Sequence, residues 1–77
     1  MSSVIAHILV IAEVGSEHEL AKEIMKMQGI TEVGITYGEF DLVIKAVAEN
    51  IAELDKIVTE IRRNPNIIRT STLFWST

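Results

Sequence analysis

The 77-residue chain has no cysteine, one proline, one tryptophan and four glycines. Without cysteine it can form neither a disulfide nor a thiolate metal site, which are two common supports for a small core. Small domains without such supports often gain stability by oligomerising. Because a chain of this length leaves room for one domain only, we expect a single domain over residues 1–77 that associates with itself.

Basic residues are also few. Seven Lys and Arg stand against eleven Asp and Glu, which gives a formal net charge of −4. Nucleic-acid binding depends on basic side chains that displace phosphate counterions. Arg62, Arg63 and Arg69 form only a loose basic group at the end of a predicted helix and in a predicted strand. We therefore expect no direct binding of nucleic acid by this chain alone.

Long hydrophobic runs are absent as well. The longest run, Val4–Ala12, is interrupted by His7 and is far shorter than the about 20 residues that span a bilayer. No signal peptide is visible. We expect no membrane association and a location in the cytosol. With 48% hydrophobic and 23% charged residues, the composition is that of a globular domain.

Hydrophobic patterning predicts four strands and two helices. Runs rich in β-branched and apolar residues indicate the strands, and apolar positions at helical spacing indicate the helices. The expected strands are Val4–Ala12, Ile30–Tyr37, Asp41–Ala48 and Ile67–Phe74. The expected helices run from about Glu17 to Met27 and from the capping residue Asn50 to Arg62 and Arg63.

Capping signals support the ends of both helices. Ser16 with Glu19, and Asn50 with Glu53, fit the capping-box pattern. In that pattern each side chain of the pair accepts a hydrogen bond from a free backbone N–H group. Gly29 is placed to stop the first helix.

The expected order is β-α-β-β-α-β, which is the split-βαβ, ferredoxin-like arrangement of the α+β class. It places the first and third strands in the centre of a four-stranded antiparallel sheet, with two helices on one face. The sequence agrees, because Val4–Ala12 and Asp41–Ala48 are the two most apolar strands. Both are apolar at odd and even positions, as in strands covered on both faces.

The second face of that sheet needs a cover. The chain's own two helices cannot hide all of its central apolar residues, such as Ala6, Ile8, Val10, Val43 and Val47. The sequence is compatible with either the odd-numbered or the even-numbered residues of these strands facing the helices. Two sheets stacked face to face, about 10 Å apart, would bury the remaining residues. We therefore expect a dimeric α/β sandwich.

The densest set of groups that could hold a small polar ligand lies between the second and third strands. We expect a tight turn at Gly38–Glu39, with a positive φ at Gly38, flanked by Tyr37, Phe40 and Asp41. The carboxylates of Glu39 and Asp41 would suit an ammonium group, as in a bound amino acid. The ordinary alternative is turn chemistry, in which Asp bonds to nearby backbone N–H groups.

A few other residues have both a functional and an ordinary interpretation. Thr70 and Thr72 lie two apart in the last strand, so their hydroxyls share one face; they could bind a ligand carboxylate or be plain edge residues. His7 is either a core or interface histidine with a hydrogen-bond partner, or a ligand contact or pH-sensitive interface group. His18 is expected in solvent, and Trp75 is expected to be an interface anchor.

No catalytic constellation is visible in the sequence. There is no Gly-rich phosphate loop, no Gly-x-Ser-x-Gly motif and no Cys nucleophile. The two histidines, His7 and His18, are not at metal-ligand spacing. We therefore predict no catalytic residue, no metal and no cofactor.

Two segments carry a resemblance to a known family. Tyr37-Gly38-Glu39-Phe40-Asp41-Leu42 resembles the Gly-x-aromatic-Asp turn of the Lrp/AsnC (leucine-responsive, feast/famine) transcription regulators. Asn64-Pro65-Asn66-Ile67, followed by Thr70-x-Thr72, is similar to the proline turn and final strand of that family, although glycine often stands where this chain has Asn66. The resemblance covers essentially the whole chain and matches only the C-terminal effector domain, called the RAM domain (regulation of amino-acid metabolism). The chain is thus identified as a stand-alone RAM domain without the helix-turn-helix.

The resemblance implies dimers formed by sheet stacking, further assembly into rings of dimers, and amino-acid effectors bound where dimers meet. It also implies backbone and carboxylate contacts from the turn that includes Tyr37, Gly38, Glu39, Phe40 and Asp41, and hydroxyl contacts from Thr70 and Thr72. The expected function is a non-enzymatic amino-acid sensor that regulates transcription or amino-acid metabolism, by association with DNA-binding Lrp/AsnC relatives.

Two other functions stay open. Dimeric ferredoxin-like folds also include small monooxygenases and isomerases, whose sites lie in a cavity between helices and sheet and need convergent His, Asn, Tyr or Trp side chains. Only His7, Tyr37 and Trp75 are available for such a site, and fold alone does not fix function. The third interpretation is a purely structural assembly module, which would bind no ligand.

Overall fold

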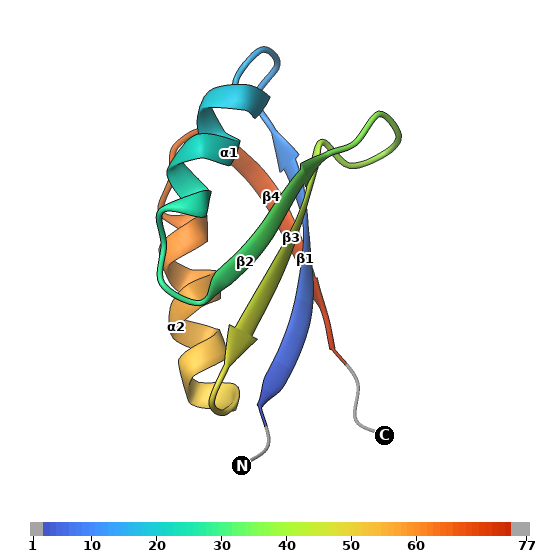
Figure 1. The fold of residues 1–77 in the computed structure, drawn as a ribbon. Helices are drawn as coiled ribbons and strands as arrows, with labels where there is room; N and C mark the ends of the chain where they lie inside the picture. The colour runs from blue at the N-terminus through green and yellow to red at the C-terminus, as the bar shows by residue number, and fades with distance from the viewer. Residues whose placement is uncertain (1–2, 75–77) are drawn as a thin grey trace.

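A computed structural model describes residues 3–74 as one antiparallel sheet covered on one face by two helices (Figure 1). The elements follow the order β1 (Val4–Ala12), α1 (Glu17–Met25), β2 (Ile30–Ile35), β3 (Leu42–Ala48), α2 (Ile51–Arg62) and β4 (Ile67–Leu73). This confirms the predicted α+β, ferredoxin-like βαββαβ fold. Within the described residues, no helix is long and apolar enough to cross a membrane.

The two most apolar strands lie in the centre of the sheet. The strand order is β2-β3-β1-β4, so that β1 and β3 are central and β2 and β4 form the edges, as predicted. All three pairings are antiparallel. Both edge pairings contain a register shift: one between Ile30 and Glu32 in β2, the other between Ile11 and Ala12, where β1 meets β4.

The hydrophobic core lies between the sheet and the helices. On the central strands every second side chain is fully buried, and these residues are Ala6, Ile8, Val10, Leu42, Ile44 and Ala46. Leu20 and Ile24 of α1 and Leu54 and Ile61 of α2 cover them and are themselves buried. Full burial of such a side chain contributes about 1.5–3 kcal/mol. The predicted apolar stripes of both helices are therefore the core contacts.

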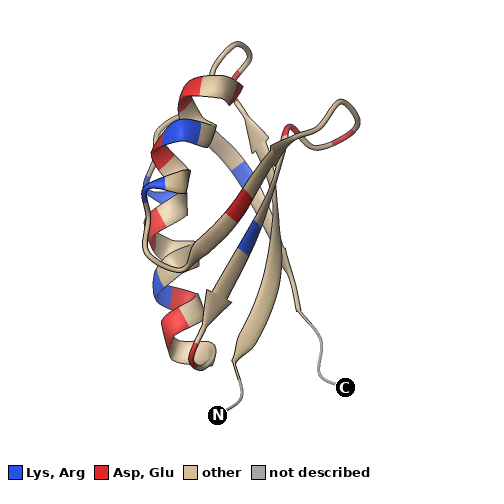
Figure 2. Ribbon diagram, in the orientation of Figure 1, with Lys and Arg blue, Asp and Glu red and all other residues tan. Residues whose placement is uncertain are grey.

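The opposite side of the sheet is called the outer face here. Residues directly opposite each other on neighbouring antiparallel strands share a face, so the register assigns its members. They are Ile5, His7, Leu9, Ile11, Glu32, Gly34, Val43, Lys45, Val47, Arg69, Ser71 and Leu73. Acidic and basic residues gather on the helices and loops, and few lie on the strands (Figure 2). The two central strands thus present a mainly apolar outer face that neither α1 nor α2 covers (Figure 1).

The two predicted capping boxes behave differently. Asn50 Oδ1 accepts a hydrogen bond from the Glu53 N–H at 2.9 Å, as predicted, whereas the Glu53 carboxylate lies 3.4 Å from Lys56 Nζ. The box at Ser16 and Glu19 was wrong, because Ser16 makes no side-chain cap bond. Its hydroxyl donates instead to the Glu13 carbonyl at 2.6 Å.

Helix α1 ends at Met25, two residues before the predicted end at Met27. The chain then turns through Gly29, whose φ is +91°. The Gly29 carbonyl accepts a hydrogen bond from the Val47 N–H at 2.7 Å, and a Cβ at this position would lie 2.7 Å from Ile57 Cδ1. The predicted stop at Gly29 is therefore not at the helix end: the C-cap is Lys26, and Gly29 forms the later turn that leads into β2.

Candidate functional site

The segment predicted as a tight turn is a longer loop, residues 36–41. Strand β2 ends at Ile35 instead of Tyr37, and β3 begins at Leu42 instead of Asp41. Gly38 does not have the expected positive φ; within residues 3–74 only Gly15 and Gly29 do among the glycines.

Thr36 and Asp41 close the base of this loop. The Thr36 N–H donates to the Asp41 carbonyl at 3.0 Å, and the Thr36 hydroxyl donates to the Phe40 carbonyl. The Thr36–Asp41 bond continues the register of the last ladder pair, Ile35–Leu42, so that residues 37–40 form the open part of the loop.

Asp41 also fixes the loop to the central strand β1. Its carboxylate Oδ2 accepts a hydrogen bond from the Ala12 N–H at 2.8 Å, and its own N–H donates to the Val10 carbonyl at 2.8 Å. The carboxylate thus binds a backbone N–H group, but on a strand 29 residues away and not within the turn, as the ordinary alternative expected. That this segment contacts an effector remains a prediction. The contact would involve the other carboxylate oxygen of Asp41 or the backbone of the loop.

The tip of the loop is open to solvent. Tyr37 is 93% exposed, Gly38 and Glu39 are exposed, and Phe40 is half-buried. The loop projects beyond the sheet on the side away from the helices (Figure 1). Its tip is therefore free to contact another molecule.

Thr70 and Thr72 lie on β4 at the same end of the sheet, but on its helix side. Thr70 is opposite Val10 and Thr72 is opposite Ile8, two residues that are fully buried under the helices. Because Leu42, Val10 and Thr70 are in register across three strands, Thr70 lies roughly 10 Å from the start of β3. Within this chain, β1 separates the loop from the threonines, which lie on the helix side of the sheet, whereas the loop projects away from the helices (Figure 1).

The remaining predicted residues are dispersed. His18 is exposed in the first turn of α1, and Trp75 lies outside the described residues. Arg69 lies on the outer face, opposite Ile11. Arg63 is the C-cap residue of α2, and its Nη1 atom lies 3.3 Å from Glu60 Oε2. In the part of the chain that the structure describes, no group of three or more His, Asp or Glu could hold a metal ion.

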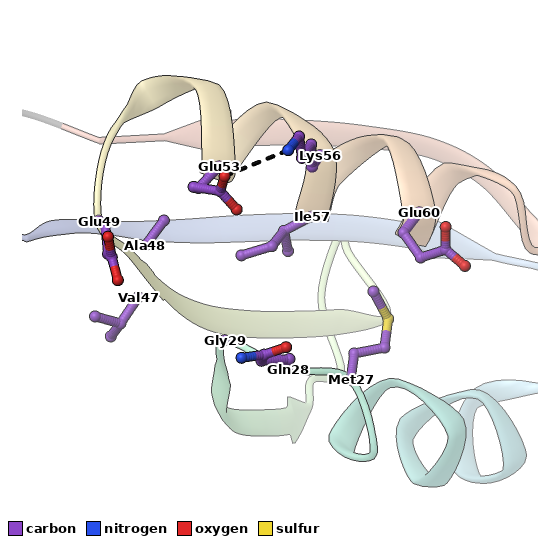
Figure 3. A pocket seen from close by; sticks show the side chains of 10 residues that line it. All are labelled: Met27, Gln28, Gly29, Val47, Ala48, Glu49, Glu53, Lys56, Ile57 and Glu60. Atoms are coloured by element: carbon purple, nitrogen blue, oxygen red, sulfur yellow. Dashed lines mark hydrogen bonds and ion pairs between the residues drawn. The ribbon is translucent and has the colours of Figure 1, made fainter.

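A groove of about 820 Å³ lies elsewhere, between the turn after α1, the end of β3 and helix α2 (Figure 3). Its lining residues are Met27, Gln28, Gly29, Val47, Ala48, Glu49, Glu53, Lys56, Ile57 and Glu60. Three of these side chains are acidic, and the Lys56 ammonium lies against the Glu53 carboxylate. None of the seven predicted effector residues is among them.

Sequence reasoning missed this groove because its lining comes from three separate segments. The only sequence signal is the spacing of Glu53, Ile57 and Glu60, which share one face of a helix. The groove lining has none of the His, Asn, Tyr or Trp side chains that the monooxygenase or isomerase interpretation requires.

Comparisons with known proteins agree with this fold. The family model of the Lrp/AsnC ligand-binding domain matches residues 5–76. The HTH-type transcriptional regulator FL11 of Pyrococcus abyssi is 32% identical over 71 residues, which cover 92% of this chain and 47% of that protein. The chain spans less than half the length of the curated relatives it matches.

Solved structures give the same result. The crystal structure of FFRP-DM1 matches with a TM-score of 0.90 at 35% identity, covering 95% of this chain and 99% of that one. The Neisseria meningitidis regulator NMB0573, in complex with L-Met, has the same fold with a TM-score of 0.84 at 16% identity, covering 96% of this chain and 50% of that one. Together with the match over residues 5–76, these findings show that the chain belongs to the Lrp/AsnC ligand-binding domain family of transcription regulators.

Proposed function

We propose that this chain is a non-enzymatic sensor that binds a small amino acid between subunits and passes the bound state on through its assembly. The observation that carries the proposal is the match of the Lrp/AsnC ligand-binding domain to residues 5–76. With a net charge of −4, the chain acts on DNA only through DNA-binding relatives in the cytosol.

The mainly apolar outer face supports a dimer. Ile5 and Leu73 are each 49% exposed on this face, beside Leu9, Val43 and Val47 of the central strands. Stacking the outer faces of two subunits about 10 Å apart buries these side chains. A standard interface buries about 800 Å² per subunit, which is the scale of one face of a small sheet.

A complete effector site requires more than one subunit. The loop offers the carboxylates of Glu39 and Asp41 for an ammonium group, and β4 offers the Thr70 and Thr72 hydroxyls for a carboxylate. Because β1 separates these groups within one subunit, we place the site where the loop of one dimer meets β4 of another. The complex of NMB0573 with L-Met supports amino acids as the first ligands to test.

Native mass spectrometry, with and without a mixture of the common amino acids, tests the sensor. We expect an even-numbered assembly that gains a defined amino-acid mass per subunit. Thr70→Val and Thr72→Val remove the hydroxyls at nearly constant volume and should abolish the mass gain without changing the assembly. Thr59→Val, on the exposed side of α2, is the matched control and should bind normally. An assembly that takes up no amino acid contradicts the sensor and favours a structural module.

Association with DNA-binding relatives needs its own test. We expect the tagged chain to co-purify a full-length Lrp/AsnC regulator from cells that express both proteins. Val43→Asp, which places a charge on the outer face, is expected to abolish co-purification if the relative uses the same face. Failure to recover any such relative contradicts the association with DNA-binding relatives. It does not bear on ligand binding, which native mass spectrometry tests separately.

A further inference from the structure

The groove between the turn after α1, the end of β3 and helix α2 has an apolar floor. The side chains of Met27 and Ile57 project into the space between that turn and α2 (Figure 3), and the buried residue Ala48 lies at the end of β3. Met27 and Ile57 are half-buried and pack against the core. The floor therefore offers apolar surface to another molecule, on the side of the sheet opposite the outer face.

Acidic side chains border this floor. Glu53 and Glu60 lie on α2 and Glu49 lies just before it, and all three are exposed. Among the lining residues these three acidic side chains stand against one basic side chain, Lys56, which gives a formal charge of −2. The start of a helix favours negative charge, but Glu60 lies in the last turn of α2, where a carboxylate is not favoured. The excess of carboxylates therefore suits a positively charged partner.

The groove is elongated. A second hollow of about 310 Å³ lies between the second half of α1 and the end of α2, and it shares Met27 and Glu60 with the first. Its lining includes buried apolar residues of both helices. There Asn64 Nδ2 donates a hydrogen bond of 2.7 Å to Glu23 Oε2, which connects the segment after α2 to α1. The two hollows form one groove alongside α2, which fits a segment of polypeptide better than a compact ligand.

We propose that this groove is a docking site for a basic amphipathic segment of a partner protein. Apolar side chains of the segment pack on Met27 and Ile57, as amphipathic helices do in apolar grooves. Its Lys and Arg side chains lie against the bordering carboxylates. Glu53 and Glu60 are two helical turns apart on α2, about 10 Å along its axis, which matches basic residues spaced by two turns on a partner helix. The site is additional to the proposed sensor and dimer, because the outer face lies on the other side of the sheet.

Fluorescence anisotropy with a defined peptide tests the docking site. The probe is a labelled peptide of repeated Leu-Arg-Ala-Leu-Leu-Arg-Lys units, which places leucine on one helix face and basic residues beside it. Its counterpart has Glu in place of every Arg and Lys. We expect the basic peptide to bind and the acidic peptide not to bind. Raising the salt concentration from about 0.05 M to about 0.5 M should weaken binding, because salt screens the exposed charges.

Variants at exposed positions locate the peptide, with circular dichroism to establish that each one folds. Glu53→Gln combined with Glu60→Gln should raise the dissociation constant roughly fivefold. Glu13→Gln combined with Glu19→Gln is the matched control, because it makes the same change in net charge at exposed positions outside the groove; it should bind like the original protein. Gln28 is exposed and lines the groove, so Gln28→Glu should tighten binding and Gln28→Lys should weaken it.

Several outcomes would overturn the docking site. If the basic peptide does not bind, or if both double variants bind it equally, the groove does not hold such a segment. Binding of spermidine in place of the peptide assigns the groove to a small cation. A larger assembly that the variant at Glu53 and Glu60 loses assigns it to a second copy of this chain. Neither result bears on the amino-acid sensor, which native mass spectrometry tests separately.

Discussion

Replacing Asp41 with alanine is expected to weaken the fold itself. Asp41 Oδ2 accepts a hydrogen bond at 2.8 Å from the N–H of Ala12, a residue that is 5% exposed. Alanine leaves this N–H group without its partner, and losing a hydrogen bond to a charged group costs about 1.5–3 kcal/mol. In a domain of this size each kcal/mol lowers the melting temperature by about 4–8 °C, so a loss of about 2 kcal/mol lowers it by roughly 8–16 °C.

Thermal and urea unfolding, followed by circular dichroism, measure this loss. Asp41→Asn keeps an acceptor oxygen near Ala12 and should retain most of the stability. Glu39→Ala, two residues away in the exposed part of the same loop, should change the free energy of unfolding by less than about 0.5 kcal/mol. The reasoning is refuted if Asp41→Ala is as stable as Glu39→Ala. The same series also shows which variant suits ligand titrations, because Asp41→Asn alters the carboxylate without releasing the loop.

Two further predictions follow from backbone conformation and from the outer face. Gly29→Ala should lose about 1–2 kcal/mol for its positive φ and a further amount, about 1 kcal/mol or more, for the contact at 2.7 Å with α2. Gly15→Ala, with φ +86° and open space around it, should lose only the stability that depends on the positive φ. If urea unfolding shows equal losses for the two variants, the contact with α2 contributes nothing. Val43→Asp should give folded monomers in sedimentation experiments, while Val14→Asp, at a position that is 100% exposed, should leave the dimer unchanged.

Much of the fold follows from residue patterns that act over short distances. β1 and β3 are apolar at both parities, which indicates central strands, and Leu20 and Ile24 lie one helical turn apart on the buried side of α1. The capping box at Ser16 failed for an equally local reason. Ser16 has helical backbone angles (φ −95°, ψ −4°) in place of the extended conformation of a capping residue, and its hydroxyl donates to the Glu13 carbonyl.

The candidate site was harder to predict because its geometry depends on contacts between distant residues. The sequence indicates a turn near Gly38, but the bond that fixes the loop to the central strand β1 joins Asp41 to Ala12, which lies 29 residues away. The residue types expected for an amino-acid ligand are present in the loop and in β4. Only the register of Val10 with both Leu42 and Thr70 shows that a strand lies between them.

The irregular edges of the sheet limit the ways in which subunits can be added. An edge strand with a regular row of free backbone groups invites another strand to pair with it, and chains that do so form open fibres. In this fold the pairings of β2 and of β4 each contain a register shift, and bulges bend and twist a strand. Charged Glu32 and Arg69 also lie on these two edge strands. Growth in the plane of the sheet is thereby discouraged, which leaves the outer face as the surface on which another molecule can be added without forming an open fibre.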